Sequence, residues 1–319
     1  MLPANGSCDY NGLEDPRAFS AGSGSSFVAG AVLEHVKIGR NGALRAFRCV
    51  SRQVLVSPLQ RTIRVLRAPF PRLTAEKNWV VLEGTRLVYV LFDQQLRTHF
   101  IDCGPQQNGD INGGDLRCAY GGFVRWTVHR PHQAQTRTPA RHQLKLAQEL
   151  VRVRSSTNWL RIGPKRMLAI AHEAHVTIPA SDTSGAVVEY ASRFLRWDEG
   201  NGTLAVFERT YFGSMEAMGE APSRKGRVEF STGLRMDPSR PGHVLIAYGV
   251  ADCHAQVARA PLEVLNRLRV DFWLRQDGAL QSRGTMPSEV DVSSGPAQGG
   301  VRGRGRAVPL RAIVSSRWA

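Results

Sequence analysis

Short apolar runs rich in β-branched and aromatic residues recur along the chain and predict strands. The clearest of these runs are Phe27–Leu33, Leu87–Phe92, Met167–Ala171 and Val244–Tyr248. Val80–Leu82 and Leu87–Phe92 flank Glu83-Gly84-Thr85-Arg86, which predicts a hairpin. Helical periodicity is confined to two short stretches, Gln143–Arg154 and Pro261–Leu268. The pattern therefore predicts an all-β chain with short helices.

The predicted strands share one sequence pattern. A compact polar motif and a loop precede each strand, and a carboxylate or a histidine stands at its end. The polar motifs are Glu14–Arg17, Glu76–Trp79, Arg154–Thr157 and Glu229–Gly233. They recur roughly 60 to 80 residues apart, a spacing that suits four-stranded antiparallel blades stacked radially as a β-propeller. A propeller would bring polar groups that are distant in sequence to one central funnel.

Two stretches depart from this pattern. Residues 104–145 are rich in Gly, Asn, Gln, Arg and His, which predicts an irregular surface insertion. Residues 281–319 are dominated by Ser, Gly, Pro and Arg, and they bury too little apolar surface to offset their ordering entropy. We therefore expect a β-propeller over 1–280 and a disordered low-complexity tail over 281–319.

Length and composition narrow the class of protein. The chain has 319 residues, 42% of them hydrophobic, which is enough for a sizeable core. No stretch approaches the roughly 18 apolar residues of a membrane span, and residues 1–26 lack the order of a secretory signal. We therefore expect no membrane span and take the cytoplasm as the default compartment. The five cysteines are odd in number and form no CxxC pair, which disfavours a disulfide scaffold and a thiolate zinc site.

The net charge of +15 has two interpretations. Clustered Lys and Arg favour a polyanion partner, whereas an arginine-biased composition spread over a solvated surface favours none. The basic residues form no single stripe interleaved with aromatic residues, and no nucleic-acid motif occurs. We do not expect a nucleic acid partner. A basic RNA- or protein-interaction propeller is kept as a third alternative, because the tail carries the alternation Arg302–Arg306.

Short sequence motifs indicate neither a metal site nor a cofactor site. His172 and His175 would point to opposite faces of a strand, so we expect no metal site there. No P-loop, GxGxxG or GxSxG occurs, and we expect no cofactor. Asn5-Gly6-Ser7 and Asn201-Gly202-Thr203 match the N-glycosylation sequon, which carries little weight without an export signal.

The polar residues around the predicted strands combine carboxylates with cations. Those expected to contact substrate are Asp15, Arg17, Lys77, Asn78, Arg154, His172, Glu173 and Asp252. Sugar hydroxyls need such a mixture, because each hydroxyl both donates and accepts hydrogen bonds. Facing carboxylates could act as the acid and base of glycosidic cleavage, and the cations would admit phosphate as the attacking group. Structural alternatives stay open, since Asp15 and Arg17 also suit a turn with an ion pair.

Four motifs, in this order, resemble a known superfamily. They are GLEDPRAF at 12–19, EKNWVVL at 76–82, His172-Glu173, and IAYGVADCHAQVA at 246–258. They resemble the five-bladed β-propellers of the glycoside hydrolase and phosphorylase superfamily, in particular the β-mannoside phosphorylases and uncharacterised propellers associated with glycosyltransferases. The resemblance covers about residues 12–270 apart from 104–145. Four of five repeats are visible, so we expect either a truncated chain or a propeller that is incomplete at its N-terminus.

The resemblance implies roles for individual residues. It places Glu34 at the general acid, with Leu33 where the family has Tyr, and Arg154 near the phosphate-contacting arginine. Other matching positions are Lys77, Asn78, His172, Tyr248, Gly249 and Asp252. It therefore predicts a hydrolase- or phosphorylase-like protein that binds an oligosaccharide or glycoside, with inorganic phosphate as a co-substrate. The alternative is a non-catalytic glycan-binding or accessory domain of a glycosyltransferase system.

Overall fold

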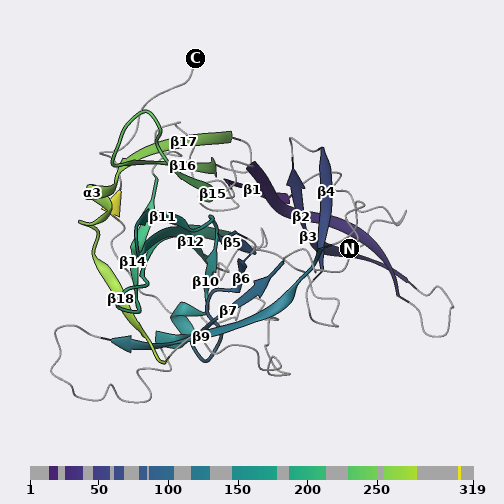
Figure 1. The fold of residues 1–319 in the computed structure, drawn as a ribbon, viewed down its shortest axis with the longest axis horizontal. Coiled ribbons are helices and arrows are strands. Elements are labelled where there is room, and N and C mark those ends of the chain that lie inside the picture. Colours follow the sequence, from purple (N-terminus) through teal and green to yellow (C-terminus); the bar gives the residue numbers. More distant parts are fainter. Residues whose placement is uncertain are drawn as a thin grey trace. The chain divides into compact units, whose positions relative to one another are not determined.

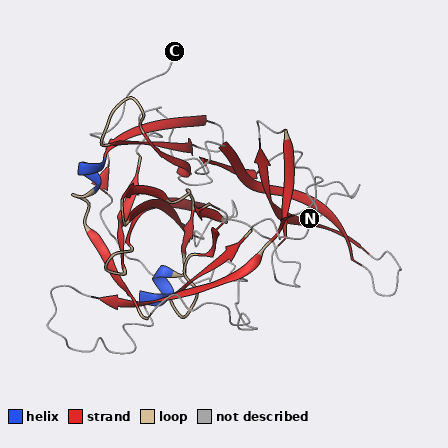
Figure 2. Cartoon of the chain, viewed as in Figure 1, coloured by secondary structure: helices blue, strands red, loops and turns tan. Residues whose placement is uncertain are grey.

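The computed structural model describes the chain in separate ranges, and strands dominate them. The described residues are 14–20, 26–38, 46–57, 61–67, 79–84, 86–103, 116–129, 146–177, 187–212, 229–250, 254–278 and 308–309. Two short helices occur among them, at 146–150 and at α3, Leu262–Leu265 (Figure 2). The mainly β class predicted from the apolar runs is confirmed, whereas the division into five blades stays a prediction.

The chain divides into two compact units. Unit 1 comprises Met1–Tyr89 and Phe100–Gly121, and unit 2 comprises Val90–His99 and Gly122–Ala319. The chain passes from one unit to the other within three strands, which are β6, Arg86–Val90, β7, Arg97–Asp102, and β9, Ala119–His129. The single propeller expected over 1–280 stays a prediction.

Unit 1 begins with four strands that pair in chain order. They are β1, Glu14–Ser20, β2, Ser26–Ile38, β3, Ala46–Ser57, and β4, Thr62–Arg67 (Figure 1). All three pairings are antiparallel, and β4 also pairs in parallel with β8, Leu116–Arg117. The register of β1 shifts between Glu14 and Arg17, where Pro16 has no N–H to donate. The predicted strand Phe27–Leu33 is confirmed as part of the longer β2.

The predicted hairpin in unit 1 is also confirmed. Strand β5, Val80–Glu83, pairs antiparallel with β6, and Gly84 adopts a positive φ of 57° in the turn. Arg86 Nε and Nη2 donate to the two carboxylate oxygens of Asp102 at 2.8 and 3.1 Å. The hydrogen bond to Asp102 raises the pKa of Arg86. A Cβ at Gly121 would lie 2.8 Å from Asp102 Oδ2, so a larger residue there would force the Asp102 carboxylate to shift.

The insertion expected at 104–145 is only partly irregular, and this prediction is corrected. Strands β8 and β9 lie within it. In β9 the buried residues Val124 and Trp126 alternate with the exposed residues Arg125 and Thr127, which is the period-two pattern of a strand. The Gly, Arg and His content of the surrounding sequence concealed this alternation. Residues 104–115 and 130–145 lie outside the described residues.

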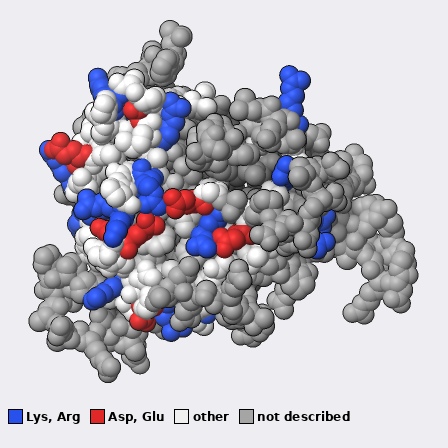
Figure 3. All heavy atoms as spheres, in the orientation of Figure 1, with Lys and Arg blue, Asp and Glu red and all other residues white. Residues whose placement is uncertain are grey.

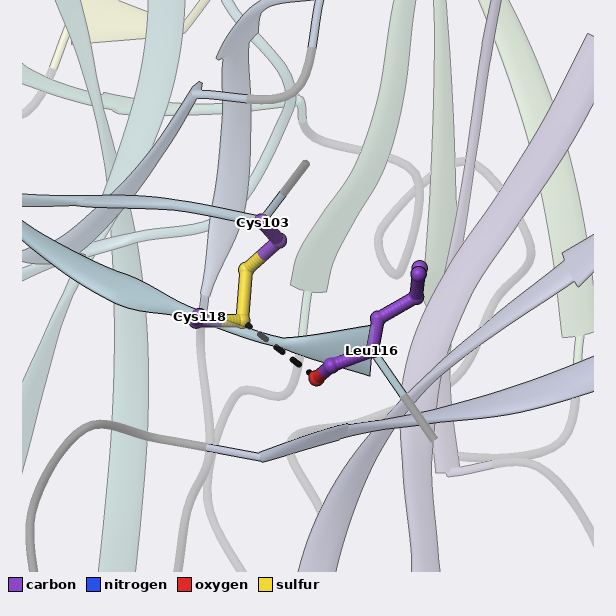
Figure 4. Close-up of a disulfide and its surroundings, with 3 residues drawn as sticks. All are labelled: Cys103, Leu116 and Cys118. Carbon is purple, nitrogen blue, oxygen red and sulfur yellow. Dashed lines mark hydrogen bonds between the residues drawn. A yellow bond between two sulfur atoms is a disulfide. The ribbon is translucent and has the colours of Figure 1, made fainter. Parts of the chain in front are cut away.

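A disulfide joins Cys103 to Cys118 in unit 1, so the expectation drawn from the odd cysteine count was incomplete (Figure 4). The bond connects the residue after β7 to the residue between β8 and β9, with a Cα–Cα distance of 4.1 Å. Cys118 Sγ also lies 3.9 Å from the carbonyl oxygen of Leu116. Because a disulfide sulfur carries no hydrogen, this is a contact and not a hydrogen bond.

Unit 2 contains two sheets. The strands of the larger sheet are β10, Val153–Ser155, β11, Leu160–Gly163, β12, Arg166–Thr177, β13, Val187–Asp198, β14, Thr203–Tyr211, and β18, Val270–Gln276. Their order is β10-β12-β13-β14-β18-β9, and β11 pairs with the beginning of β12. The second sheet has the order β15-β16-β17, with bounds Glu229–Met236, His243–Val250 and His254–Pro261 (Figure 1).

The core of unit 2 joins these two sheets. Alternate residues of β16, Val244, Ile246, Tyr248 and Val250, are buried, as expected for a strand with one covered face. They belong to one apolar cluster with residues from the larger sheet, which are Leu168, Ile170, Phe194, Ala205 and Phe207. One face of β12, β13 and β14 therefore packs against the three-stranded sheet, and the predicted strands Met167–Ala171 and Val244–Tyr248 are confirmed.

The helices and the tail differ from expectation. Only 146–150 of the predicted helix Gln143–Arg154 is helical in the described residues, because Val153 and Arg154 already belong to β10. The helix expected at Pro261–Leu268 is confirmed in shortened form as α3. Most of the tail lies outside the described residues, but Val308 and Pro309 form β19, which pairs with β14. None of the described helices is long and apolar enough to cross a membrane.

Candidate functional site

The residues predicted to contact substrate are distributed over both units. Asp15 and Arg17 lie on β1 and Glu34 lies on β2, where it pairs with Val50, all in unit 1. Unit 2 carries the others that are described: Arg154 on β10, and His172 and Glu173 on β12. Lys77, Asn78 and Asp252 lie outside the described residues. Within unit 2, Arg154 pairs directly with His172, whereas Glu173 follows His172 on the opposite face of β12.

A row of polar residues crosses the larger sheet of unit 2. Arg154 pairs with His172, His172 with Ser192, and Ser192 with Thr210. Directly paired residues share one face of an antiparallel sheet, so these four side chains form a line across β10, β12, β13 and β14. Arg154 is exposed, whereas the other three are buried. The row therefore runs from solvent into the interior of unit 2.

His172 is held by a hydroxyl and two aromatic rings. Ser156 Oγ lies 2.7 Å from His172 Nδ1, and the ring centroid of Phe230 lies 4.7 Å from that of the imidazole. The ring of Tyr190 lies 5.7 Å from His172 and 5.9 Å from Phe230, so the three rings contact one another. We call Arg154, Ser156, His172, Tyr190 and Phe230 the His172 cluster.

The chain folds this way because of the motif that follows β10. The backbone N–H groups of Ser156 and Thr157 both donate to the carbonyl oxygen of Ile170, at 3.2 and 3.0 Å. This turn places the Ser156 hydroxyl beside β12, where it reaches His172, the second residue after Ile170. Deeper in the row, the hydroxyl of Ser192 lies 3.3 Å from that of Ser231 on β15, and the Thr210 hydroxyl donates to the carbonyl of Ser192. The polar groups behind the imidazole are therefore paired within the protein.

Tyr190 and Phe230 give the cluster an apolar surface beside a cation. Both rings are half-buried, and Arg154 is exposed on the sheet face that carries His172. Ligand sites commonly combine aromatic walls with a few fixed polar groups. A guanidinium offers donors to hydroxyl, carboxylate or phosphate oxygens, while ring faces pack against apolar C–H surfaces. Sequence reasoning named Arg154 and His172 but did not select Tyr190 or Phe230.

Glu173 points away from this cluster, since successive residues of a strand face opposite sides. Its side chain is 1% exposed, and Arg193 Nε donates to Oε2 at 2.8 Å. Arg209 donates to both carboxylate oxygens, at 3.0 and 2.7 Å, and this hydrogen bonding raises the pKa of Arg209. Arg193 also contacts Asp271 at 3.0 Å. The geometry favours a structural role for Glu173, joining β12 to β13 and β14, over the predicted sugar contact.

A second charged cluster was missed by sequence reasoning. Asp93 Oδ2 accepts from Arg97 Nε at 2.7 Å and lies 2.9 Å from Nε2 of His99, which is fully buried. The Arg97 guanidinium lies over the ring of Phe123, 5.2 Å from its centroid. Burial opposes ionisation of Asp93, but the hydrogen bonds from His99 and Arg97 outweigh it and hold its pKa at about 2. The only sequence signal for this cluster was the short spacing that separates an acidic residue, Asp93, from Arg97 and His99.

The face drawn in Figure 3 carries side chains of both charge signs. Figure 3 shows Lys and Arg interspersed with Asp and Glu in that view. Ion pairs join Arg161 to Glu199 at 3.0 Å and Arg166 to Asp198 at 3.5 Å. This distribution favours the solvated-surface interpretation of the net charge over a nucleic acid stripe. The described residues contain no group of three His, Cys, Asp or Glu side chains placed to hold a metal ion.

Two solved structures of low sequence identity are similar to this chain. No family model and no curated protein matches the chain. One neighbour is MPT-1, a GDP-Man-dependent mannosyltransferase from Leishmania mexicana, with 12% identity over 79% of this chain and 69% of that chain, and a TM-score of 0.39. Another is a glycosyl hydrolase from Bacteroides ovatus, with 11% identity over 82% of this chain and 86% of that chain, and a TM-score of 0.26. At these TM-scores neither neighbour establishes a shared fold.

Proposed function

We propose that this chain is a carbohydrate-active protein that binds a glycan through the His172 cluster. The observation that carries the proposal is the contact of Tyr190 and Phe230 with His172 on the sheet face where Arg154 is exposed. A sugar ring has apolar C–H faces and a rim of hydroxyls. The aromatic rings suit the faces, and the guanidinium suits the rim or a phosphate.

The burial of the polar row supports binding without rearrangement. Ser156 fixes the imidazole through Nδ1, and the hydroxyls of Ser192 and Ser231 contact each other behind it. A ligand would therefore meet side chains that are already ordered, and less conformational entropy would be lost on binding. His172 is only 5% exposed, so little of its surface is open to a ligand.

We further propose that the activity is of the glycoside hydrolase or phosphorylase type, with Glu34 as the general acid. The support is the sequence resemblance, in which Glu34 ends the strand that follows the first motif. Asp15 and Arg17, on the neighbouring strand β1, would contact the sugar, as would Lys77, Asn78 and Asp252. Arg154 would receive inorganic phosphate, with His172 beside it. Binding without turnover would instead support the accessory-domain alternative.

The proposed architecture is a five-bladed β-propeller. The four successive antiparallel strands β1 to β4 and the meander β15-β16-β17 are arrangements of the kind that build blades. The order β12-β13-β14-β18-β9 departs from separate four-stranded blades, because the pairing continues from β18 to β9. An experimental structure that resolves five separate blades would support the propeller, and a continuous sheet would contradict it.

Glycan binding is tested by measuring affinity for manno-, gluco- and galacto-configured oligosaccharides with variants of the cluster. Arg154→Ala should weaken binding about tenfold or more, since a hydrogen bond to a charged group contributes about 1.5–3 kcal/mol. Tyr190→Ala should also weaken binding, because it removes the apolar ring surface that packs against the sugar. Arg235→Ala removes an exposed arginine elsewhere on unit 2 and is the matched control. Equal affinity of all three variants and the unaltered protein would contradict the proposed site.

Turnover is tested separately by incubating each glycoside with and without phosphate and measuring released sugar and sugar phosphate. Glu34→Gln should abolish release while leaving glycan affinity nearly unchanged, because the amide cannot donate the proton that a carboxylic acid supplies. Full activity of this variant would remove Glu34 from the mechanism. Release that requires phosphate would identify phosphorolysis, and release in water alone would identify hydrolysis.

A further inference from the structure

The turn between β13 and β14 carries the sequon Asn201-Gly202-Thr203 in an exposed position. Asp198 pairs with Thr203 at the base of the hairpin, and Asn201 lies exposed in the turn that joins them. Gly202 has a φ of 63°, a conformation that glycine adopts at little cost. A glycosylated asparagine lies on the surface of a folded protein, and the exposed position of Asn201 meets that requirement.

The side chain of Asn201 is oriented by its own sequon. Its Oδ1 accepts a hydrogen bond from the backbone N–H of Thr203 at 3.1 Å and one from the Thr203 hydroxyl at 2.5 Å. A backbone N–H can only donate, so the atom that faces it must be the amide oxygen and not the nitrogen. The turn therefore binds the oxygen and directs Nδ2, the atom that would carry a glycan, away from Thr203.

The disulfide supplies an independent observation about compartment. Cys103 and Cys118 are bonded in unit 1, whereas Asn201 lies in unit 2. Disulfides persist in secreted, endoplasmic reticulum and extracellular proteins and are rare in reducing compartments. The bond weighs against the cytoplasm expected from residues 1–26 and favours the compartments in which N-glycosylation takes place. The sequon is uninformative by itself, but in an oxidising compartment it would meet the enzymes that glycosylate asparagine.

We propose that Asn201 is an N-glycosylation site of a chain that folds in an oxidising compartment. The donor would be an oligosaccharide linked through C1 to a polyprenyl diphosphate. Asn201 Nδ2 attacks C1, a C–N bond forms, and the C1–oxygen bond to the diphosphate breaks. The polyprenyl diphosphate leaves with the bonding electrons, and Nδ2 releases one proton. This modification is independent of any glycan bound as a substrate at the His172 cluster.

The test uses the full chain expressed from its own gene, with its natural flanking sequence, and isolated from its native source. Trypsin releases Asn201 in a peptide spanning 197–209, which follows Arg196 and ends at Arg209. Peptide N-glycosidase in heavy-oxygen water converts a glycosylated asparagine to aspartate that carries the heavy isotope. A trypsin digest kept in heavy-oxygen water without the glycosidase corrects for spontaneous deamidation, to which the Asn201-Gly202 pair is prone. Non-reducing digestion in the same sample detects the Cys103–Cys118 link.

Two substitutions make the result specific. Asn201→Asp keeps an oxygen that accepts from Thr203 but lacks the nucleophilic nitrogen, so the heavy-isotope signal should disappear from a protein that folds normally. Thr203→Ser keeps the sequon and its hydroxyl, so most of the signal should persist. A peptide 197–209 without glycan overturns the proposed site, and free thiols at Cys103 and Cys118 overturn the inferred compartment. A glycan at Asn201 together with the disulfide supports both.

Discussion

Replacing Asp93 with asparagine tests how charge stabilises the turn between β6 and β7. Asp93 Oδ1 accepts from the backbone N–H groups of Gln95 and Arg97 at 2.8 and 2.9 Å. Oδ2 accepts from Arg97 Nε and lies against His99 Nε2. Asparagine can keep the oxygen that faces the two backbone groups, but it places an NH₂ group against two further donors. The substitution therefore removes the charged interactions and spares the local turn.

The magnitude follows from the burial of Arg97, whose side chain is 7% exposed. Without the carboxylate, Arg97 is a buried cation whose main acid partner is gone, a change that typically costs about 3–5 kcal/mol. The stacking of Arg97 over Phe123 does not replace that partner, because a cation–π contact contributes about 0.5–2 kcal/mol. We expect Asp93→Asn to lower the free energy of unfolding by about 3 kcal/mol at pH 7.

The effect should depend on pH in one direction. The pKa of Asp93 is lowered from 3.8 to about 2, so its ionisation stabilises the folded state above pH 4. That contribution, at most about 2 kcal/mol once partial solvent screening is allowed for, is lost as pH falls through 2. The difference in stability between the unaltered protein and Asp93→Asn should therefore shrink by about 1 kcal/mol between pH 6 and pH 3.

The assay is urea unfolding at several pH values, followed by tryptophan fluorescence, because Trp126 donates to Thr98 at 2.8 Å beside this turn. Glu263→Gln is the control, since Glu263 is exposed and pairs only at the surface with Arg267, and its effect should stay within about 0.5 kcal/mol. A pH-independent difference, or a loss below 1 kcal/mol at pH 7, would refute the proposed role of the charge.

Three further substitutions probe other parts of the fold. Phe194→Ala should lower stability by about 3–5 kcal/mol, measured by chemical denaturation, because this fully buried ring lies in the core of unit 2. Glu173→Gln should cost about 3–5 kcal/mol in the same assay, because the buried Arg193 loses a charged partner, and an effect below 1 kcal/mol would show that Asp271 compensates. Cys103→Ser should cost about 3 kcal/mol in unit 1, as expected for a link between residues 15 apart, and equal melting temperatures with and without reductant would contradict this.

The strands could be predicted where apolar residues are consecutive or turn signals are strong. Met167–Ala171 is apolar throughout because both faces of β12 are covered in unit 2. Glycine in Glu83-Gly84-Thr85-Arg86 marked the β5–β6 turn correctly. Strand β9 was missed because Gly121 and Gly122 interrupt its alternation, and a Cβ at Gly121 would meet the Asp102 carboxylate. A steric requirement set by a distant residue leaves no local trace in the sequence.

The candidate site could be predicted only in part. Arg154 and His172 stood out because charged residues beside apolar strands are conspicuous, but pairing across β10 and β12 depends on register. Tyr190 and Phe230 read as ordinary strand residues, since nothing local shows that β13 and β15 would bring their rings to His172. The link between Cys103 and Cys118 was equally hidden, because five cysteines allow many pairings.

Glu173 lies on the face of β12 opposite to the one that carries His172, and the His172 face also packs against the three-stranded sheet. On one face, Glu173 joins β12 to β13 and β14 through two arginines, an arrangement that resists sliding of these strands because any change of register would separate buried charges. On the other face, the register fixed in this way holds His172 in line with Arg154 and Ser192. A site built from a row across strands needs that rigidity, since a one-residue slip of any strand would move its member of the row to the opposite face. The buried ion network is therefore the physical reason that the exposed end of the row can hold a defined geometry for a ligand.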